Sequence, residues 1–252
     1  MVTRKTSALV FLLAVIAWKA ALGQSHDGFR LTRGLTNHTV DPKLVSVRSV
    51  TVTDRGTTFR LLNHSSSPVL AVVLVFQRLD PTGKQVGNGR VLYDALTVPP
   101  FAAKPIPVGG MQEYFLGTPP VSRIQDTICP FLTAVVLEDG RTSGSPESIN
   151  WILGQRRVYR DAWADILQIL KAHQGQPEST KGTLIGELEA ARDRRLKAEK
   201  DSYVEVLIQS AFQDCITNIS FDLPGDAYKR RLEQLLARFS EGQARLSAAR
   251  LP

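Results

Sequence analysis

The four histidines of the chain are the first residues to consider for metal binding or acid–base chemistry. They lie far apart, at His26, His38, His64 and His173, and no pair has the spacing of metal ligands. The helical H-E-x-x-H pattern of zinc peptidases is absent as well. Because an unpaired histidine is usually a solvated surface residue, we interpret all four in this way. The sequence therefore predicts neither a metal site nor a cofactor.

Motifs for nucleophilic or nucleotide chemistry are also missing. No serine lies in a G-x-S-x-G elbow. Gly87-Asn88-Gly89 lacks the third glycine and the following helix of a dinucleotide-binding loop, so we interpret it as a turn. Glu113, Glu138 and Asp139 resemble ordinary hairpin acids, but two carboxylates that cleave a sugar chain need to be close only in space. We therefore expect no enzyme, and a carboxylate-dependent hydrolase of envelope or extracellular polymers is the alternative.

Arg156, Arg157 and Arg160 form the most unusual group of charged residues. They lie in a stretch whose other residues have helical periodicity, so their side chains are expected to project from one helix. We mark these three arginines as candidate contacts for the acidic groups of a partner protein. Pairing with Asp161 and Asp165 within the same chain is the alternative.

Two cysteines, Cys129 and Cys215, are the remaining reactive side chains. Neither has a neighbouring histidine, and Cys129 adjoins Pro130 at the start of an apolar run. We predict that they either form one disulfide bond or stay buried, and that neither acts as a nucleophile.

The first 23 residues have the three parts of a secretory signal peptide. Arg4 and Lys5 give the positive start, residues 8–18 are apolar, and small residues at Ala21 and Gly23 precede the expected cleavage before Gln24. The apolar run is shorter than the roughly 20 residues that span a membrane. We therefore expect an exported protein, periplasmic or secreted, with no transmembrane segment after cleavage.

Charge argues against a nucleic-acid partner. The chain has a formal charge of +7, which falls to +4 when the three basic residues of the signal peptide are removed. The most charged stretch, residues 192–200, interleaves acids with bases, which is typical of a solvated helix face. Peripheral binding to anionic membrane surfaces through basic helices remains an alternative function.

Two periodicities divide the mature sequence. Residues 24–43 are polar, and we expect a flexible N-terminal arm there. Residues 44–145 alternate apolar and polar residues between turn signals such as Asp80-Pro81-Thr82-Gly83 and Glu138-Asp139-Gly140, which predicts about seven strands in an antiparallel β-sandwich.

Residues 146–252 have helical periodicity and predict about three helices. Ser145 and Pro146 give an N-cap and a first helical residue, and the first helix is expected to end near His173. A second helix is predicted from near Thr183 to near Thr217 and a third from Tyr228 onward. Trp151 and Trp163, at helical spacing among aliphatic residues, are predicted to be core anchors.

Two strand runs indicate how the halves pack. Residues 69–76 and 131–137 are apolar on both alternating faces, whereas a strand of a free-standing sandwich needs only one apolar face. We expect these two strands to lie in one sheet and the helices to pack on its outer face. The predicted fold class is α+β.

Residues 59–72 and 133–144 carry a family resemblance. The first segment, with Asn63-His64-Ser65 and Pro68 between two strands, resembles part of the immunoglobulin-like domain of exported bacterial proteins. The second is similar to the late hairpin of the same proteins, which an arginine-containing helix follows. The resemblance implies an immunoglobulin-like β-sandwich with a helical appendage and a bacterial envelope setting. It assigns no catalytic residue.

Together these features favour a non-enzymatic exported interaction or structural module. Its partner is expected to be another envelope or extracellular protein.

Overall fold

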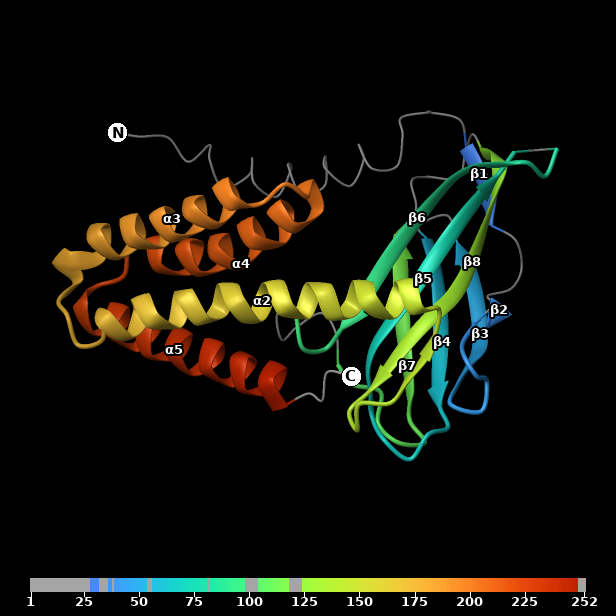
Figure 1. The fold of residues 1–252 in the computed structure, drawn as a ribbon, viewed down its shortest axis with the longest axis horizontal. Helices are drawn as coiled ribbons and strands as arrows, with labels where there is room; N and C mark the ends of the chain where they lie inside the picture. Colours follow the sequence, from blue (N-terminus) through green and yellow to red (C-terminus); the bar gives the residue numbers. More distant parts are fainter. Residues whose placement is uncertain are drawn as a thin grey trace. The chain divides into compact units, whose positions relative to one another are not determined.

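The computed structural model describes residues 28–31, 36–37, 39–53, 56–80, 82–97, 104–117 and 124–248. The predicted signal peptide and its cleavage site lie outside the described residues. The fold is α+β (Figure 1). The chain divides into a strand unit, comprising 1–93, 105–137 and 142–149, and a helical unit, comprising 94–104, 138–141 and 150–252.

The strand unit contains two sheets. The strands are β1 (Gly28–Leu31), β2 (Thr36–Asn37), β3 (Val45–Thr53), β4 (Gly56–Asn63), β5 (Val69–Leu79), β6 (Gln85–Asp94), β7 (Met111–Gly117), β8 (Ile124–Leu137) and β9 (Thr142–Gly144). One sheet has the order β1-β8-β5-β6, with β2 and β9 also paired to β8, and the other has the order β3-β4-β7. The antiparallel pairing of β5 with β8 confirms that the two apolar runs lie in one sheet. Strands β1 and β2 run parallel to β8, so the described parts of residues 24–43 include paired strands where we expected a flexible arm.

Two predicted turns have a positive φ at their glycine, a backbone conformation that glycine adopts readily. Gly83 has φ +84° in the turn between β5 and β6, and Gly140 has φ +88° between β8 and β9. The Asp80 carboxylate accepts hydrogen bonds from the Thr82 hydroxyl at 2.6 Å and the Lys84 amide at 3.0 Å. Because these bonds favour the charged form, they lower the pKa of Asp80.

Both sheets contribute to one hydrophobic core. Phe59, Leu61 and Tyr114 from the β3-β4-β7 sheet belong to the same buried cluster as Val72 and Val135 from the other sheet. The rings of Phe59 and Tyr114 stack with centroids 5.5 Å apart. The apolar residues that alternate with polar ones along the strands are therefore those that point into this core.

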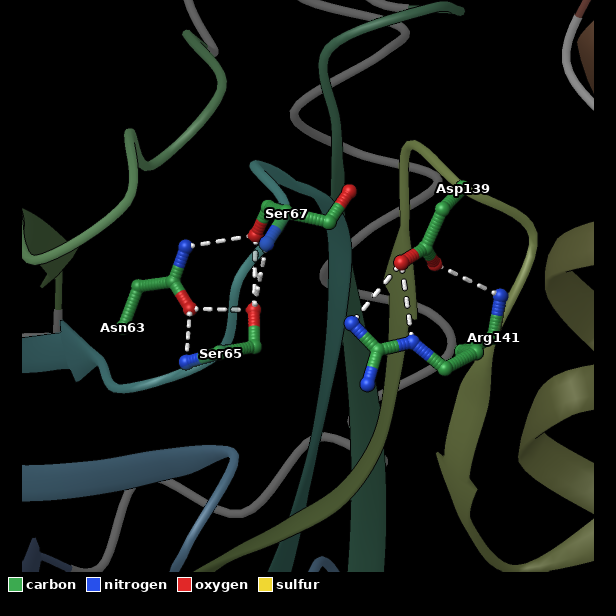
Figure 2. Close-up of polar contacts among 5 residues, drawn as sticks. All are labelled: Asn63, Ser65, Ser67, Asp139 and Arg141. Atoms are coloured by element: carbon green, nitrogen blue, oxygen red, sulfur yellow. Dashed lines mark hydrogen bonds and ion pairs between the residues drawn. The ribbon is translucent and has the colours of Figure 1, made fainter.

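The Asn63–Pro68 loop is held by a buried polar network (Figure 2). The Asn63 side chain is fully buried, and its Nδ2 donates to the carbonyl oxygens of Ser67 at 2.9 Å and Ile106 at 3.0 Å. Its Oδ1 accepts from the Ser65 amide at 2.9 Å and the Ser65 hydroxyl at 2.7 Å. The Asn-x-Ser pattern that carries the family resemblance is therefore a loop-forming device.

Thr133 organises the start of the first helix. The β5–β8 register shifts beside this residue, which frees its carbonyl to accept from the Ser145 amide at 2.7 Å and the Thr39 hydroxyl at 2.8 Å. Ser145 is the predicted N-cap: its hydroxyl accepts from the Ser148 amide at 3.1 Å. Gly144 has φ +126°, and a β-carbon there would lie 2.1 Å from the Thr133 oxygen. The close passage of the chain thus requires glycine.

The described residues contain four α-helices, where the sequence predicted three. They are α2 (Pro146–Ala172), α3 (Lys181–Ala198), α4 (Ser202–Ser220) and α5 (Gly225–Ala248), with a short 3-10 helix, η1 (Glu178–Thr180). The predicted second helix breaks after Ala198. Asp201 caps α4 by accepting from the amides of Tyr203 and Val204, and the Glu199 side chain accepts from the amides of Lys200 and Asp201. These local bonds replace helical ones, because a carboxylate oxygen can accept from a backbone amide in place of a helical carbonyl.

The helices of the second unit share a core of their own. Its members come from all four helices and include Ile166, Leu188, Phe212 and Phe239. Trp163 is half-buried and packs against this cluster, as predicted for a core anchor. None of the described helices combines the length and apolarity needed to cross a membrane.

Candidate functional site

The three arginines marked from sequence have different environments. Arg157 is exposed, and its Nε donates to the Leu153 carbonyl at 3.4 Å. Arg160 is half-buried and pairs with Asp161 at 3.0 Å, which is the intrachain alternative. Asp165 pairs instead with Arg195 of α3, at 2.6 Å. The structure therefore does not bring the three together as one surface.

Arg156 is corrected from a partner contact to a buried structural residue. Only 1% of its side chain is exposed, and none of the side chain of Asp94, its partner. Two hydrogen bonds join them, from Nε to Oδ2 at 2.8 Å and from Nη2 to Oδ1 at 3.1 Å. No local sequence pattern indicates this pair, because the two residues are 62 positions apart.

The histidines and cysteines form no cluster in the described part of the chain. His64 lies 2.7 Å from the Ser46 hydroxyl at the surface, but His173 is buried, contrary to its predicted exposure. Its Nε2 lies 3.3 Å from a Glu187 oxygen. Among the described residues, no three histidine, cysteine or acidic side chains are grouped as metal ligands. His26 and His38 lie outside the described residues.

The Cys215 side chain is buried, and burial raises the pKa of its thiol to about 12. This environment opposes formation of the reactive thiolate. The side chain of Cys129 lies outside what the structure describes, so its pairing with Cys215 stays a prediction.

A cleft in the helical unit is the best candidate for a binding site. It has a volume of about 120 Å³. Its lining comes from the turn after β6 (Ala95, Leu96, Thr97), α2 (Tyr159, Trp163), α4 (Ser210, Ala211, Asp214) and α5 (Arg238, Phe239, Glu241, Gly242, Arg245). Four separate segments therefore converge on one small hollow.

One side of the cleft is aromatic. The Tyr159 and Trp163 rings are 5.6 Å apart, and Trp163 meets Phe239 edge to face at 6.1 Å. Tyr159 and Trp163 lie four residues apart on α2, a spacing that places both on one helix face. Burial raises the pKa of Tyr159, so its hydroxyl stays protonated at neutral pH. These rings offer a rigid apolar surface to a ligand.

Two ion pairs also line the cleft. Arg238 of α5 pairs with Asp214 of α4, and Glu241 pairs with Arg245 one turn further along α5. The Arg238 guanidinium also lies over the Phe239 ring, 5.1 Å from its centroid. Burial lowers the pKa of Arg238, and the guanidinium stays charged at neutral pH. These four residues, which we call the rim of the cleft, are polar, and their charges cancel in pairs.

Sequence reasoning identified Trp163 only as a core anchor, and it did not single out Tyr159, Asp214, Arg238 or Glu241 as site residues. No local pattern could have joined them, because each ion-paired acid also looks like an ordinary surface acid. Two of the three hairpin acids considered for hydrolysis are ion-paired as well: Glu113 with Arg60 at 2.7 Å, and Asp139 with Arg141 at 2.8 Å (Figure 2).

Comparison with known proteins assigns no family. No family model matches the chain, and no curated protein matches it. Among solved structures, the chain is similar to "X-ray structure of Northeast Structural Genomics Consortium target SoR45", with a TM-score of 0.22 and 12% identity. That alignment covers 40% of this chain and 75% of the other.

Proposed function

We propose that this chain is an exported, non-enzymatic binding protein whose helical unit accepts an apolar or aromatic side chain of a partner protein. The observation that carries the proposal is the cleft: Tyr159, Trp163 and Phe239 lie beside two ion pairs in one small hollow. Ligand-binding pockets commonly combine aromatic and apolar side chains with polar groups that orient the ligand.

The charges favour a neutral ligand. Each acid of the cleft already has an arginine partner, so a charged ligand would have to displace an existing pair. An uncharged side chain can cover the rings, while the peptide groups that flank it bond to the carboxylates and guanidiniums of the rim. A protein segment supplies both features, which fits the expected envelope or extracellular partner.

Nuclear magnetic resonance of the ¹⁵N-labelled chain from Gln24 tests this proposal. Trp151 and Trp163 are its tryptophans, both on α2 and about 18 Å apart along the helix. N-acetyl-phenylalaninamide and N-acetyl-leucinamide should shift the Trp163 indole signal saturably, with a Kd of about 1 mM for so small a probe. The Trp151 signal is the internal control and should not move.

Two outcomes would contradict the proposal. One is the absence of any saturable shift at Trp163 with either probe. The other is an equal response to N-acetyl-serinamide, because a polar side chain gains nothing from the rings.

We further propose that the strand unit is an immunoglobulin-like sandwich and that the helices cover the outer face of the β5–β8 sheet. Residues on both alternating faces of these strands are buried: Val72 and Val135 belong to the shared core, and Val73 and Ala134 are 0% exposed although they lie outside it. Residues 24–145 expressed alone should then aggregate, because they would expose an apolar sheet face. A soluble monomer that unfolds as sharply as the chain from Gln24 would refute this arrangement.

The setting follows from the signal peptide. We propose that residues 1–23 are removed on export and that the protein works in the periplasm or outside the cell. Intact mass of the exported product should correspond to a chain that starts at Gln24. A product that retains residues 1–23 would contradict cleavage.

A further inference from the structure

One wall of the cleft is a turn and not a helix. Ala95, Leu96 and Thr97 follow directly after β6 and line the cleft. Leu96 and Thr97 are only 8% and 3% exposed, so the turn is an integral part of the helical unit. A turn has none of the repeated hydrogen bonds of a helix, and its position depends on specific side-chain contacts.

Asp94 supplies those contacts. Its Oδ1 accepts from the Leu96 amide at 3.0 Å, and its carbonyl oxygen accepts from the Thr97 amide at 3.3 Å. An aspartate that bonds to the amide two residues ahead is a recognised turn-forming arrangement. Here the carboxylate is completely buried, so its charge requires a partner inside the protein.

Arg156 is that partner. The guanidinium of this α2 residue bonds to both carboxylate oxygens of Asp94, at 2.8 and 3.1 Å, and it does not line the cleft. Tyr159, three residues later on α2, does line it, and the charge of Asp94 contributes to its raised pKa. Each residue of the ion pair is therefore next to, or one helical turn from, a part of the cleft wall.

We infer that Arg156 is a positioning residue: it holds Asp94, and through Asp94 the turn 95–97, in the place that shapes the cleft. Arg156 has no contact with the ligand in this scheme. Its effect on binding rests on the proposed function, whereas its effect on the turn does not.

Amide hydrogen exchange tests the effect on the turn. Arg156→Lys keeps the positive charge but cannot bond to both carboxylate oxygens in the same plane. The Leu96 and Thr97 amides should then exchange ~10-fold faster or more, while the amides of the core residues of α4 keep their protection. Arg195→Lys is the matched control: it weakens the pair with Asp165, at 2.6 Å, and should leave the Leu96 and Thr97 amides unchanged.

A double variant tests whether the Asp94 carboxylate holds the turn, even if Arg156→Lys fails to fold. Asp94→Leu with Arg156→Met replaces the buried pair by apolar side chains, a change that proteins often tolerate. The folded double variant should still exchange its Leu96 amide rapidly, because the carboxylate acceptor is gone. Unchanged exchange at Leu96 and Thr97 in any folded variant of Arg156 would overturn the inference.

Binding supplies a separate readout. With N-acetyl-phenylalaninamide as the probe, Arg156→Lys should raise the Kd measured at the Trp163 indole by ~5-fold or more, and Arg195→Lys should not. If the unmodified chain binds no probe, the proposed function fails while the exchange result still decides the role of Arg156. An unchanged Kd together with faster exchange would show that the turn does not shape the cleft and would overturn the positioning role.

Discussion

Gly242 of α5 lies directly against the indole of Trp163: a β-carbon at this position would come within 2.5 Å of the Trp163 Cζ3 atom. Because glycine has no side chain, α5 can approach α2 closely at this point. The contact also holds one side of the Trp163 ring in place. Glycine at this helical position costs up to about 1 kcal/mol relative to alanine. The close approach gives a physical reason for its presence.

Gly242→Ala should therefore move the Trp163 ring and abolish binding of N-acetyl-phenylalaninamide. Overpacking costs about 1–3 kcal/mol, which the better helix propensity of alanine partly offsets, so the fold should survive. Gly186→Ala in α3 is the control, because nothing lies within 4 Å of its β-carbon, and it should stabilise the protein by up to about 1 kcal/mol. Thermal unfolding and the Trp163 indole shift measure both. An unchanged Trp163 indole signal in Gly242→Ala would show that there is room for a β-carbon beside the ring and would contradict the prediction.

Gly144→Ala should be far more damaging. The new methyl group would meet the Thr133 carbonyl oxygen at 2.1 Å in a backbone with φ +126°. The clash breaks the junction between β9 and α2, and we expect a loss of about 3 kcal/mol or more in the free energy of unfolding. Gly83→Ala has a similarly positive φ, +84°, but open space around it, so it should cost only about 1–2 kcal/mol. Urea denaturation separates the two, and equal losses would refute the steric explanation.

Asn63→Ala should destabilise the strand unit by about 3 kcal/mol, because it removes the buried hydrogen bonds that this side chain makes to the carbonyls of Ser67 and Ile106 and to the amide and hydroxyl of Ser65. Asn88→Ala, at an exposed position, should change stability by less than about 0.5 kcal/mol. Expression in a eukaryotic secretory host adds a second measurement. Folded protein should carry no glycan on Asn63, since its amide nitrogen is buried and bonded.

Cys215 should resist alkylation until the protein unfolds. Its pKa of about 12 means that the thiol stays protonated as the pH rises from 7 to 9, so iodoacetamide should react slowly throughout this range. Addition of urea should release fast labelling at pH 9, where the ordinary pKa of an exposed thiol is exceeded. The Cys129→Ser variant, followed by mass spectrometry, isolates the Cys215 signal. Rapid labelling of the native variant, rising steeply between pH 7 and 9, would contradict the buried environment.

Local sequence determined the elements of this protein because their causes are local. The turn at Gly83, the N-cap at Ser145 and the apolar stripe of α2 follow from backbone conformation and side-chain spacing within a few residues. The sequence also predicted that β5 and β8 share a sheet. It failed at residues 199–201, where the acids look like helix-surface charges and their backbone bonds end one helix and begin another.

The tertiary structure decided everything about the candidate site. Asp94 and Arg156 look like two solvated charges until the fold buries them together, and Asp214 and Arg238 meet only because α4 and α5 lie side by side. His173 has a polar side chain, and yet the fold buries it inside the helical unit. A charged side chain carries no local signal for its partner, since ion pairing depends on distance in space and on the exclusion of water, and both are set by packing across the whole unit.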